Sequence, residues 1–547
     1  MRSFFITLLN FCLVALFRRL LIAITMANFT LIFFLSTNVA SAESISVKQF
    51  IAKASFQNDY VFQFYKNRNY KLFWLGNTGD NSARLNAFTF ALTDAPMHGL
   101  PSSKFSSKSL LSEISNVNSN EELGYLDVKL TLVFVKYASV MVNGILKPKK
   151  IDKKIERANS FNENFDFLSE LQQSDPFGFF KNLFPPSPEY KRLMKEKYRL
   201  EKLLASGGWG SLLTANKLSV GEQGGDVVLL RNRLISMGYL SSTYSSFYDQ
   251  PLVKAVKDFQ SDNGIPSDGS ANQSTLNLIN VSVEERLKSV LVAMERERWS
   301  RTPHNNRHVV VNLTDFTAKI VDSGTVTFET KAIIGFDDLN RRSPEFSDIL
   351  EFMVVNPSWY VPRSIAVQEY LPMLKVNSNA VSFLELRDNN GNIIQPGEVD
   401  FSNFDQETFP YSMRQPPGET NALGLVKFMF PNKNNIYLHD TPSKSLFELD
   451  VRAFSHGCIR LSDPFGFAYA LLAVQSDDPI SLFHFALGAN KEVKIELKKP
   501  IPIHLIYRTA ITKAGGGLQF RKDIYGRDAK IWDALQVEGV VLGSVTG

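Results

Sequence analysis

The chain has 547 residues, more than one hydrophobic core usually accommodates, so roughly two to four domains are expected. Its 44% hydrophobic and 21% charged residues are typical of folded protein and exclude extensive disorder. The formal net charge is +5, and the chain after residue 42 keeps 57 basic against 55 acidic residues, which argues against a nucleic-acid partner.

The N-terminal segment, residues 1–42, has the pattern of a secretion signal. It carries three arginines and no acidic residue, then an apolar stretch from Leu20 to Leu35 and the small residues at 40–42. A second apolar stretch at 4–17 leaves an uncleaved membrane anchor as the alternative, although each stretch is shorter than the roughly 18 residues of a spanning helix. We therefore expect an exported protein that begins near Glu43 and touches the membrane only if this segment is retained.

Two helical regions follow. Residues 43–215 read as mostly helical, with an aromatic cluster that starts at 61–65. Residues 218–282 predict three short helices, because Asp226 can begin the first, Gly238 can end it and Asp249 can cap the second.

From about residue 305 the hydrophobic pattern becomes that of strands. β-branched runs such as 308–313 and 326–335 are broken by Asp, Ser and Gly. His439 ends one later strand, and Cys458 ends another extended run ahead of a helix that Asp463 can cap. We therefore predict a mainly antiparallel β domain over residues 300–500, within a multi-domain α+β chain.

Cys458 is the only cysteine after the N-terminal segment, which contains Cys12. A lone thiol in an exported protein cannot form an internal disulfide, so chemistry is the first candidate role. A free cysteine has a pKa of about 8.5, which the following helix would lower, and it needs a nearby base. His456 is a sequence neighbour and so shapes the loop, whereas His439 approaches from another strand; we assign the base to His439.

The rest of a nucleophilic site can be assigned around this pair. The backbone carbonyl of Asp440 would orient the His439 ring, and backbone N–H groups around Gly457 and Cys458 would receive the oxyanion. Gly457 lets the chain approach a substrate closely.

These residues resemble a known enzyme family. His439 followed by Ser455-His456-Gly457-Cys458 looks like the signature of the L,D-transpeptidases, the cysteine enzymes that cross-link bacterial peptidoglycan. Further segments resemble the large, multi-domain branch of that family: 64–65, Trp74, 98–100, 295–299, 356–362, 418–430, 437–442, 507–510 and 520–526. The three helices of 218–282 resemble a small peptidoglycan-binding domain, for which a spacer role is the alternative.

The resemblance implies a domain organisation and a periplasmic location. Residues 43–215 would be a helical scaffold domain, 367–421 a capping subdomain over the active site within the 300–500 catalytic domain, and 501–547 a C-terminal segment packing on the scaffold or catalytic domain.

The resemblance also implies the reaction. Cys458 would attack the third residue of a tetrapeptide stem, release D-alanine and form a thioester, which the amine of a second stem resolves into a 3-3 cross-link. Tyr437 would line the acyl site beside His456 and Ser455. Arg460 stands where smaller relatives have Asn, and either substrate carboxylate pairing or loop support would suit it. Peptidoglycan stems are the expected partners, and a D,D-carboxypeptidase would supply the tetrapeptide.

Several alternatives remain open. The acceptor could be a protein amine or water, which would give a protein-anchoring enzyme or an L,D-carboxypeptidase. Another class is a non-catalytic wall-binding scaffold with a decayed site, which the intact His439 and Cys458 disfavour. A zinc site at His439, His456 and Cys458 lacks an evident fourth ligand. We expect no metal and no cofactor, and sensitivity to carbapenems.

Overall fold

The computed structural model describes residues 45–156, 165–300 and 306–543, so the expected secretion signal lies outside the described residues. The chain divides into two compact units: Met1–Asp94 with Lys104–Ala138 and Asp166–Asn182, and all remaining residues. In the part of the chain that the structure describes, no helix combines the length and apolar character needed to cross a membrane.

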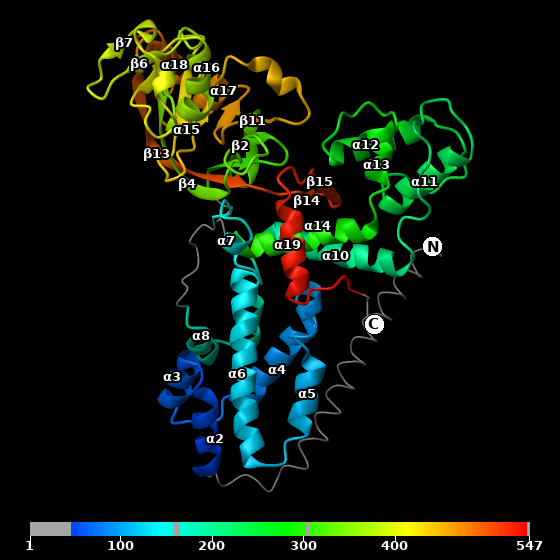
Figure 1. Cartoon of the computed structure of the whole chain (residues 1–547). Coiled ribbons are helices and arrows are strands. Elements are labelled where there is room, and N and C mark those ends of the chain that lie inside the picture. Colours follow the sequence, from blue (N-terminus) through cyan, green and yellow to red (C-terminus); the bar gives the residue numbers. More distant parts are fainter. Residues whose placement is uncertain (1–44, 157–164, 301–305, 544–547) are drawn as a thin grey trace. The chain divides into compact units, whose positions relative to one another are not determined.

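The first unit is helical, and Figure 1 shows its longest helix, α6, in cyan. Its helices are α2 (Ile45–Ser55), α3 (Asp59–Asn67), α4 (Gly79–Asp94), α5 (Ser107–Ser115), α6 (Asn120–Asn143), which continues beyond the unit, α8 (Phe167–Gln173) and α9 (Pro176–Asn182). The fully buried carboxylate of Asp127 on α6 accepts backbone N–H bonds of 2.8 Å from both Phe73 and Trp74, and the Tyr65 hydroxyl at 2.7 Å. This carboxylate therefore fixes the chain after α3 against α6.

The second unit contains further helices and the sheets. Its helical elements ahead of the sheet are η1 (Ala95–His98), α7 (Pro148–Ile151), α10 (Pro188–Ala205), α11 (Gly225–Met237), α12 (Gln250–Asp262), α13 (Gln273–Ile279) and α14 (Val283–Trp299). α11, α12 and α13 share a core of their own. Gly238 ends α11 in the left-handed conformation and Asp249 caps α12, as expected, but the N-cap of α11 is Gly224 and Asp226 lies in its first turn.

The central sheet has nine strands, of which eight form a closed ring. The order is β11-β3-β12-β10-β9-β4-β13-β1-β2, and β2 pairs again with β3. The strands are β1 (His308–Asn312), β2 (Thr317–Asp322), β3 (Thr325–Gly335), β4 (Phe346–Val355), β9 (Val426–Met429), β10 (Leu438–His439), β11 (Ala453–Ser455), β12 (Ile459–Leu461) and β13 (Val493–Ile506). Only the pairs β1–β13, β10–β12 and β3–β11 are parallel within these described strands, so the prediction of a mainly antiparallel sheet in a multi-domain α+β chain is confirmed.

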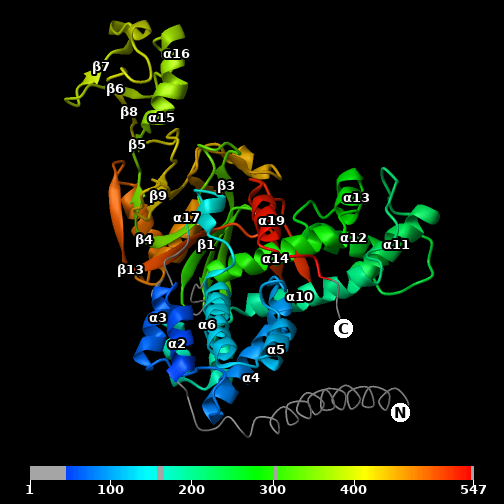
Figure 2. The ribbon, with the colours of Figure 1, turned by 60° about the horizontal axis from the view of Figure 1, so that its bottom comes forward.

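A smaller subdomain is inserted between β4 and β9, and Figure 2 shows its yellow-green elements as a separate group. It consists of β5 (Trp359–Tyr360), α15 (Arg363–Ile365), the π-helical turn η2 (Ala366–Tyr370), α16 (Leu371–Val376), β6 (Glu385–Arg387), β7 (Ile393–Ile394), η3 (Pro396–Glu398), η4 (Phe401–Asn403) and β8 (Ser412–Gln415). Trp359 pairs with Gln415 and belongs to this subdomain's core, so the subdomain begins ahead of residue 367.

The chain after β10 completes the second unit. It adds η5 (Lys444–Glu448), α17 (Pro464–Leu472), α18 (Pro479–Leu487), β14 (Ala510–Thr512), β15 (Leu518–Phe520) and α19 (Arg527–Val537). Ala510, Leu518 and Trp532 share one core with residues of α10 and α14, so the C-terminal segment packs on these two helices.

Candidate active site

The candidate residues meet on two neighbouring parallel strands. Leu438 of β10 pairs with Ile459 of β12, and the Ile459 N–H donates to the carbonyl of Tyr437 at 3.1 Å. Leu438 and Ile459 are fully buried in the core. Because side chains alternate along a strand, the residues on either side of this pair face the other way. Tyr437 and His439 therefore share one face of the sheet with Cys458 and Arg460.

The Cys458 thiol is partly buried and faces polar groups. Its Sγ lies 3.6 Å from the carbonyl oxygen of Asn435, to which the thiol donates. Burial raises the pKa of the thiol to about 11, although Tyr437 and the Arg460 cation act in the opposite direction. The pKa of the thiol is thus raised overall despite the helix that follows, because the desolvation of the thiolate outweighs the favourable interactions around it.

His439 is 4% exposed and has a defined tautomer. Its Nδ1 lies 2.5 Å from the backbone carbonyl oxygen of Asp440. A carbonyl oxygen only accepts, so Nδ1 carries the proton and Nε2 holds the lone pair. Burial, followed by the charge of Arg460, lowers the pKa of His439 to about 3. The imidazole is therefore neutral and able to take a proton at Nε2.

The Asp440 side chain fixes the end of β10. Its carboxylate accepts the N–H of Leu425 at 2.9 Å and pairs with Lys444 at 2.7 Å. Gly424 has φ +59°, and a Cβ there would lie 2.3 Å from the Asp440 carboxyl carbon. Glycine at 424 thus allows the close approach that holds Asp440, whose backbone in turn orients His439.

The Cys458 loop, residues 455–458, is closed by its own hydrogen bonds. The Ser455 hydroxyl donates to the Cys458 carbonyl at 2.6 Å and accepts the Gly457 N–H at 3.0 Å, while Gly457 has φ +117°. The Gly457 N–H is therefore engaged, whereas the Cys458 N–H makes no hydrogen bond within the described residues. Of the two expected oxyanion donors, only the Cys458 amide is available.

His456 and Arg460 have different surroundings. His456 is exposed, and its Nε2 lies 2.5 Å from the Oε1 atom of Glu369 in η2. Arg460 is half-buried, and its Nε has no hydrogen-bond partner among the described residues. The pKa of its guanidinium is lowered, because burial has a larger effect than the neighbouring Cys458, which acts in the opposite direction. The structure thus places Tyr437, His439 and Arg460 on the Cys458 side of the sheet but directs His456 toward the inserted subdomain.

Sequence reasoning did not single out Glu369 or Asn435. Glu369 lies in a π-helical turn, a feature without a simple sequence signal, and Asn435 acts through its backbone. A Pro-Asn turn at 431–435 marks the position of Asn435 but not its contact with the thiol. Within the described chain, no three His, Cys, Asp or Glu side chains are grouped to hold a metal ion.

Comparisons with known proteins agree with the resemblance. Residues 306–495 match the family "L,D-transpeptidase catalytic domain", residues 59–196 a "Scaffold domain" and residues 223–279 a "Putative peptidoglycan binding domain". A curated Haemophilus influenzae protein described as "Putative L,D-transpeptidase" is 30% identical over 272 residues, which are 48% of this chain and 54% of that protein. The match thus spans about half the length of this relative.

Two solved structures are also similar to parts of the chain. The L,D-transpeptidase of Xylanimonas cellulosilytica is 13% identical with a TM-score of 0.16, covering 54% of this chain and 98% of that one. That of Stackebrandtia nassauensis is 14% identical with a TM-score of 0.20, covering 54% and 97%. By sequence, residues 306–495 are thus similar to an L,D-transpeptidase catalytic domain, and the same chain also matches a scaffold domain and a peptidoglycan-binding domain.

Proposed function

We propose that this protein forms 3-3 cross-links between peptidoglycan stems in the periplasm, with Cys458 as the nucleophile and His439 as its base. The observation that carries the proposal is the shared sheet face of β10 and β12, which presents a thiol, a neutral imidazole and the Arg460 guanidinium to one substrate. The match of residues 306–495 to the catalytic domain family supports the reaction class.

The acylation step uses a neutral thiol and a neutral imidazole. The raised pKa of Cys458 and the lowered pKa of His439 disfavour a resting thiolate–imidazolium pair. The thiol proton would therefore move to Nε2 of His439 as the sulfur attacks the donor carbonyl. The S–C bond forms, the C–N bond to D-alanine breaks, and the proton is passed to the departing amine. The Cys458 N–H would bind the oxyanion.

The second step transfers the acyl group. The acceptor amine attacks the thioester, so that an N–C bond forms and the S–C bond breaks. The amine proton passes through His439 back to the sulfur. Arg460 would bind a carboxylate of a stem, because its guanidinium faces the thiol side of the sheet and its Nε has no hydrogen-bond partner among the described residues.

Incubation of the protein with disaccharide-tetrapeptide tests the proposal. We expect release of D-alanine, a thioester on the Cys458 peptide and a 3-3 dimer, all detected by mass spectrometry. Cys458→Ser and His439→Ala should abolish the three products. Release of D-alanine without a dimer would indicate an L,D-carboxypeptidase, a product with a protein amine would indicate an anchoring enzyme, and the absence of both release and a carbapenem adduct would favour a non-catalytic scaffold.

A second function, binding to the wall, is favoured by the match of residues 223–279 to a peptidoglycan-binding domain. The unit has its own hydrophobic core, so it can be removed without exposing the catalytic core. We expect deletion of 218–282 to weaken pelleting of the protein with purified sacculi. Unchanged pelleting would favour the spacer role.

A further inference from the structure

Ser343 lies in the loop between β3 and β4 and contacts the Cys458 loop directly. Its side chain is fully buried, and its hydroxyl donates to the carbonyl oxygen of Gly457 at 2.7 Å while accepting the N–H of Gly335 at 2.9 Å. Both hydrogen-bonding directions of the hydroxyl are therefore occupied, which fixes its rotamer.

This contact determines where the Cys458 amide points. The peptide between Gly457 and Cys458 is planar and trans, so its N–H points away from its C=O. A hydrogen bond that holds the Gly457 carbonyl on Ser343 consequently directs the Cys458 N–H to the opposite side. That N–H is the oxyanion donor that the loop leaves available, because Ser455 engages the Gly457 N–H.

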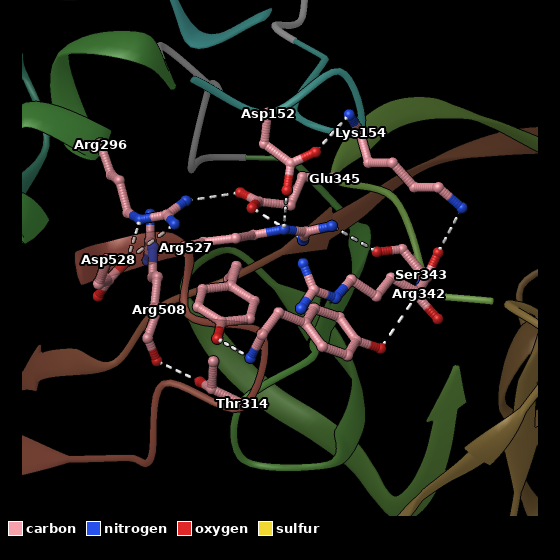
Figure 3. Close-up of polar contacts among 12 residues, drawn as sticks. Asp152, Lys154, Arg296, Thr314, Arg342, Ser343, Glu345, Arg508, Arg527 and Asp528 are labelled. Atoms are coloured by element: carbon pink, nitrogen blue, oxygen red, sulfur yellow. Dashed lines mark hydrogen bonds and ion pairs between the residues drawn. The ribbon is translucent and has the colours of Figure 1, made fainter. Parts of the chain in front are cut away.

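Ser343 is in turn held by the C-terminal segment. Arg527 is fully buried and donates from Nη2 to the Ser343 carbonyl at 2.9 Å, while its Nη1 lies 3.0 Å from Glu345. The Tyr525 hydroxyl accepts the Ser343 N–H at 3.3 Å and donates to the Gly335 carbonyl at 2.6 Å. Figure 3 shows the Arg527 side chain extended between Glu345 and Ser343.

A buried network of charges holds Arg527 in place. Its Nε lies 3.3 Å from Asp152, and Glu345 also pairs with Arg296 of α14 at 2.7 Å. Arg296 pairs with Asp528 at 2.8 Å, next to Arg527 in the chain. Removing one partner of such a buried pair would leave the other charge uncompensated, so each member depends on the others.

We propose that Ser343 is a positioning residue that aims the Cys458 amide at the oxyanion, and that the C-terminal segment, through Arg527 and Tyr525, belongs to the working active site. Arg527 and Tyr525 lie outside the residues 306–495 that match the catalytic domain. The expected effect on the rate of Cys458 acylation rests on the proposed acyl-transfer function. The expected effect on the orientation of the Gly457–Cys458 peptide does not.

Two reactions of Cys458 separate oxyanion binding from thiol reactivity. Acylation by a carbapenem forms an S–C bond at a carbonyl and passes through an oxyanion before the ring C–N bond breaks and its nitrogen takes the proton. Alkylation by iodoacetamide forms an S–C bond as iodide leaves, and it creates no oxyanion. We expect Ser343→Ala to slow acylation about tenfold or more while alkylation changes less than about twofold.

Thr509→Val is the matched control. It removes a buried hydroxyl that bonds Asp528 in the same network but does not contact the Cys458 loop. It should lower the thermal midpoint and leave both rates of Cys458 near those of the wild type. If Ser343→Ala does not fold, Ser343→Cys replaces the hydroxyl by a somewhat larger, weaker donor and should give a smaller loss of acylation. Equal loss of acylation and alkylation, or wild-type acylation, would overturn the proposal.

A spectroscopic readout is independent of activity. Gly457–Cys458 is the only Gly-Cys pair in the sequence, so the full chain labelled with carbonyl-¹³C glycine and ¹⁵N cysteine gives one cross-peak for this peptide. Loss of the hydrogen bond to the Gly457 carbonyl should shift this peak in Ser343→Ala and not in Thr509→Val. An unshifted peak would refute the positioning role even in an active enzyme. The remaining outcome is a peak that shifts in Ser343→Ala while Cys458 of the wild type is alkylated by iodoacetamide but not acylated by the carbapenem. That outcome would keep the positioning role and refute the proposed function.

Discussion

The Nε2 atom of His456 lies 2.5 Å from the Oε1 atom of Glu369, and this contact joins the Cys458 loop to the inserted subdomain. The two side chains are 36% and 41% exposed, so the pair is only partly shielded from water. A contact of this exposure contributes up to about 1 kcal/mol. The side-chain link between the Cys458 loop and the inserted subdomain is therefore weak.

The first prediction concerns access to the thiol. Glu369→Gln should increase the rate of Cys458 alkylation by iodoacetamide, up to about fivefold, because an uncharged amide holds the His456 ring less strongly than a carboxylate does. Glu407→Gln is the control, since Glu407 is an exposed residue of the same subdomain and only its backbone N–H donates to Asp405. The rates can be measured on the Cys458 peptide by mass spectrometry. An unchanged rate in Glu369→Gln would mean that the contact does not limit access.

The second prediction concerns the pH dependence of the same alkylation. A raised thiol pKa of about 11 leaves Cys458 protonated at neutral pH, so the thiolate fraction should rise about tenfold per pH unit from pH 6 to 9. In protein unfolded by urea, the pH midpoint of the alkylation rate should return to about 8.5, the pKa of a free cysteine. A plateau below pH 8 in the folded protein would indicate a resting thiolate–imidazolium pair and contradict the neutral pair described above.

Local patterns in the sequence sufficed to place His439 at the end of a strand, β10. Cys458, expected to end an extended run, lies just ahead of β12, because the bend at 456–458 separates β11 from β12. The pairing of Leu438 with Ile459 brings the two residues' neighbourhoods together. The thiol pKa could not be predicted in this way. The helix that starts after Asp463 is visible in the sequence, but the burial that raises the pKa of the thiol depends on the whole sheet.

The buried polar residues that hold the Cys458 loop could not be predicted, for a related reason. Ser343, Glu345 and Arg527 look like ordinary polar surface residues in the sequence, yet Ser343 and Arg527 are fully buried. Ser343 contacts Gly457, and Arg527 contacts Ser343 and Glu345, across more than 100 residues of sequence, so no local periodicity indicates these contacts. Long-range pairing of charges overrides the general rule that such residues are exposed.

The third prediction tests carboxylate binding by Arg460. Arg460→Met should raise KM for a tetrapeptide donor by about tenfold, because a hydrogen bond to a charged group contributes about 1.5 kcal/mol or more. With a donor whose carboxylates are amidated, Arg460→Met should change KM little. The effects of the substitution and of the amidation on KM should therefore not be additive. Lys433→Met, which removes a cation paired with Glu156, is the control. An equal effect of Arg460→Met on free and amidated donors would favour the loop-support role.

The fourth prediction concerns acid stability and His98, which is 2% exposed and lies beside Tyr190, with its Nδ1 3.1 Å from the hydroxyl. Burial, then the charge of Arg298, lowers the pKa of His98 to about 3, whereas an unfolded histidine titrates near 6.5. Between these values the unfolded state binds the proton and the folded state does not. The stability contribution is therefore complete above pH 6.5 and is lost as the pH falls, by up to about 1.4 kcal/mol per pH unit.

His98→Gln should consequently flatten the decline of the thermal midpoint between pH 6.5 and 4, although it lowers stability at pH 7 by removing packing beside Phe184 and Tyr190. Calorimetry of the transition that unfolds the core of α10 and α14 measures this slope. His484→Gln, at an exposed position on α18, is the control and should leave the slope unchanged. If His98→Gln and the wild type lose stability in parallel on acidification, the buried imidazole is not the group that takes up the proton, because only a group absent from the variant can change the slope.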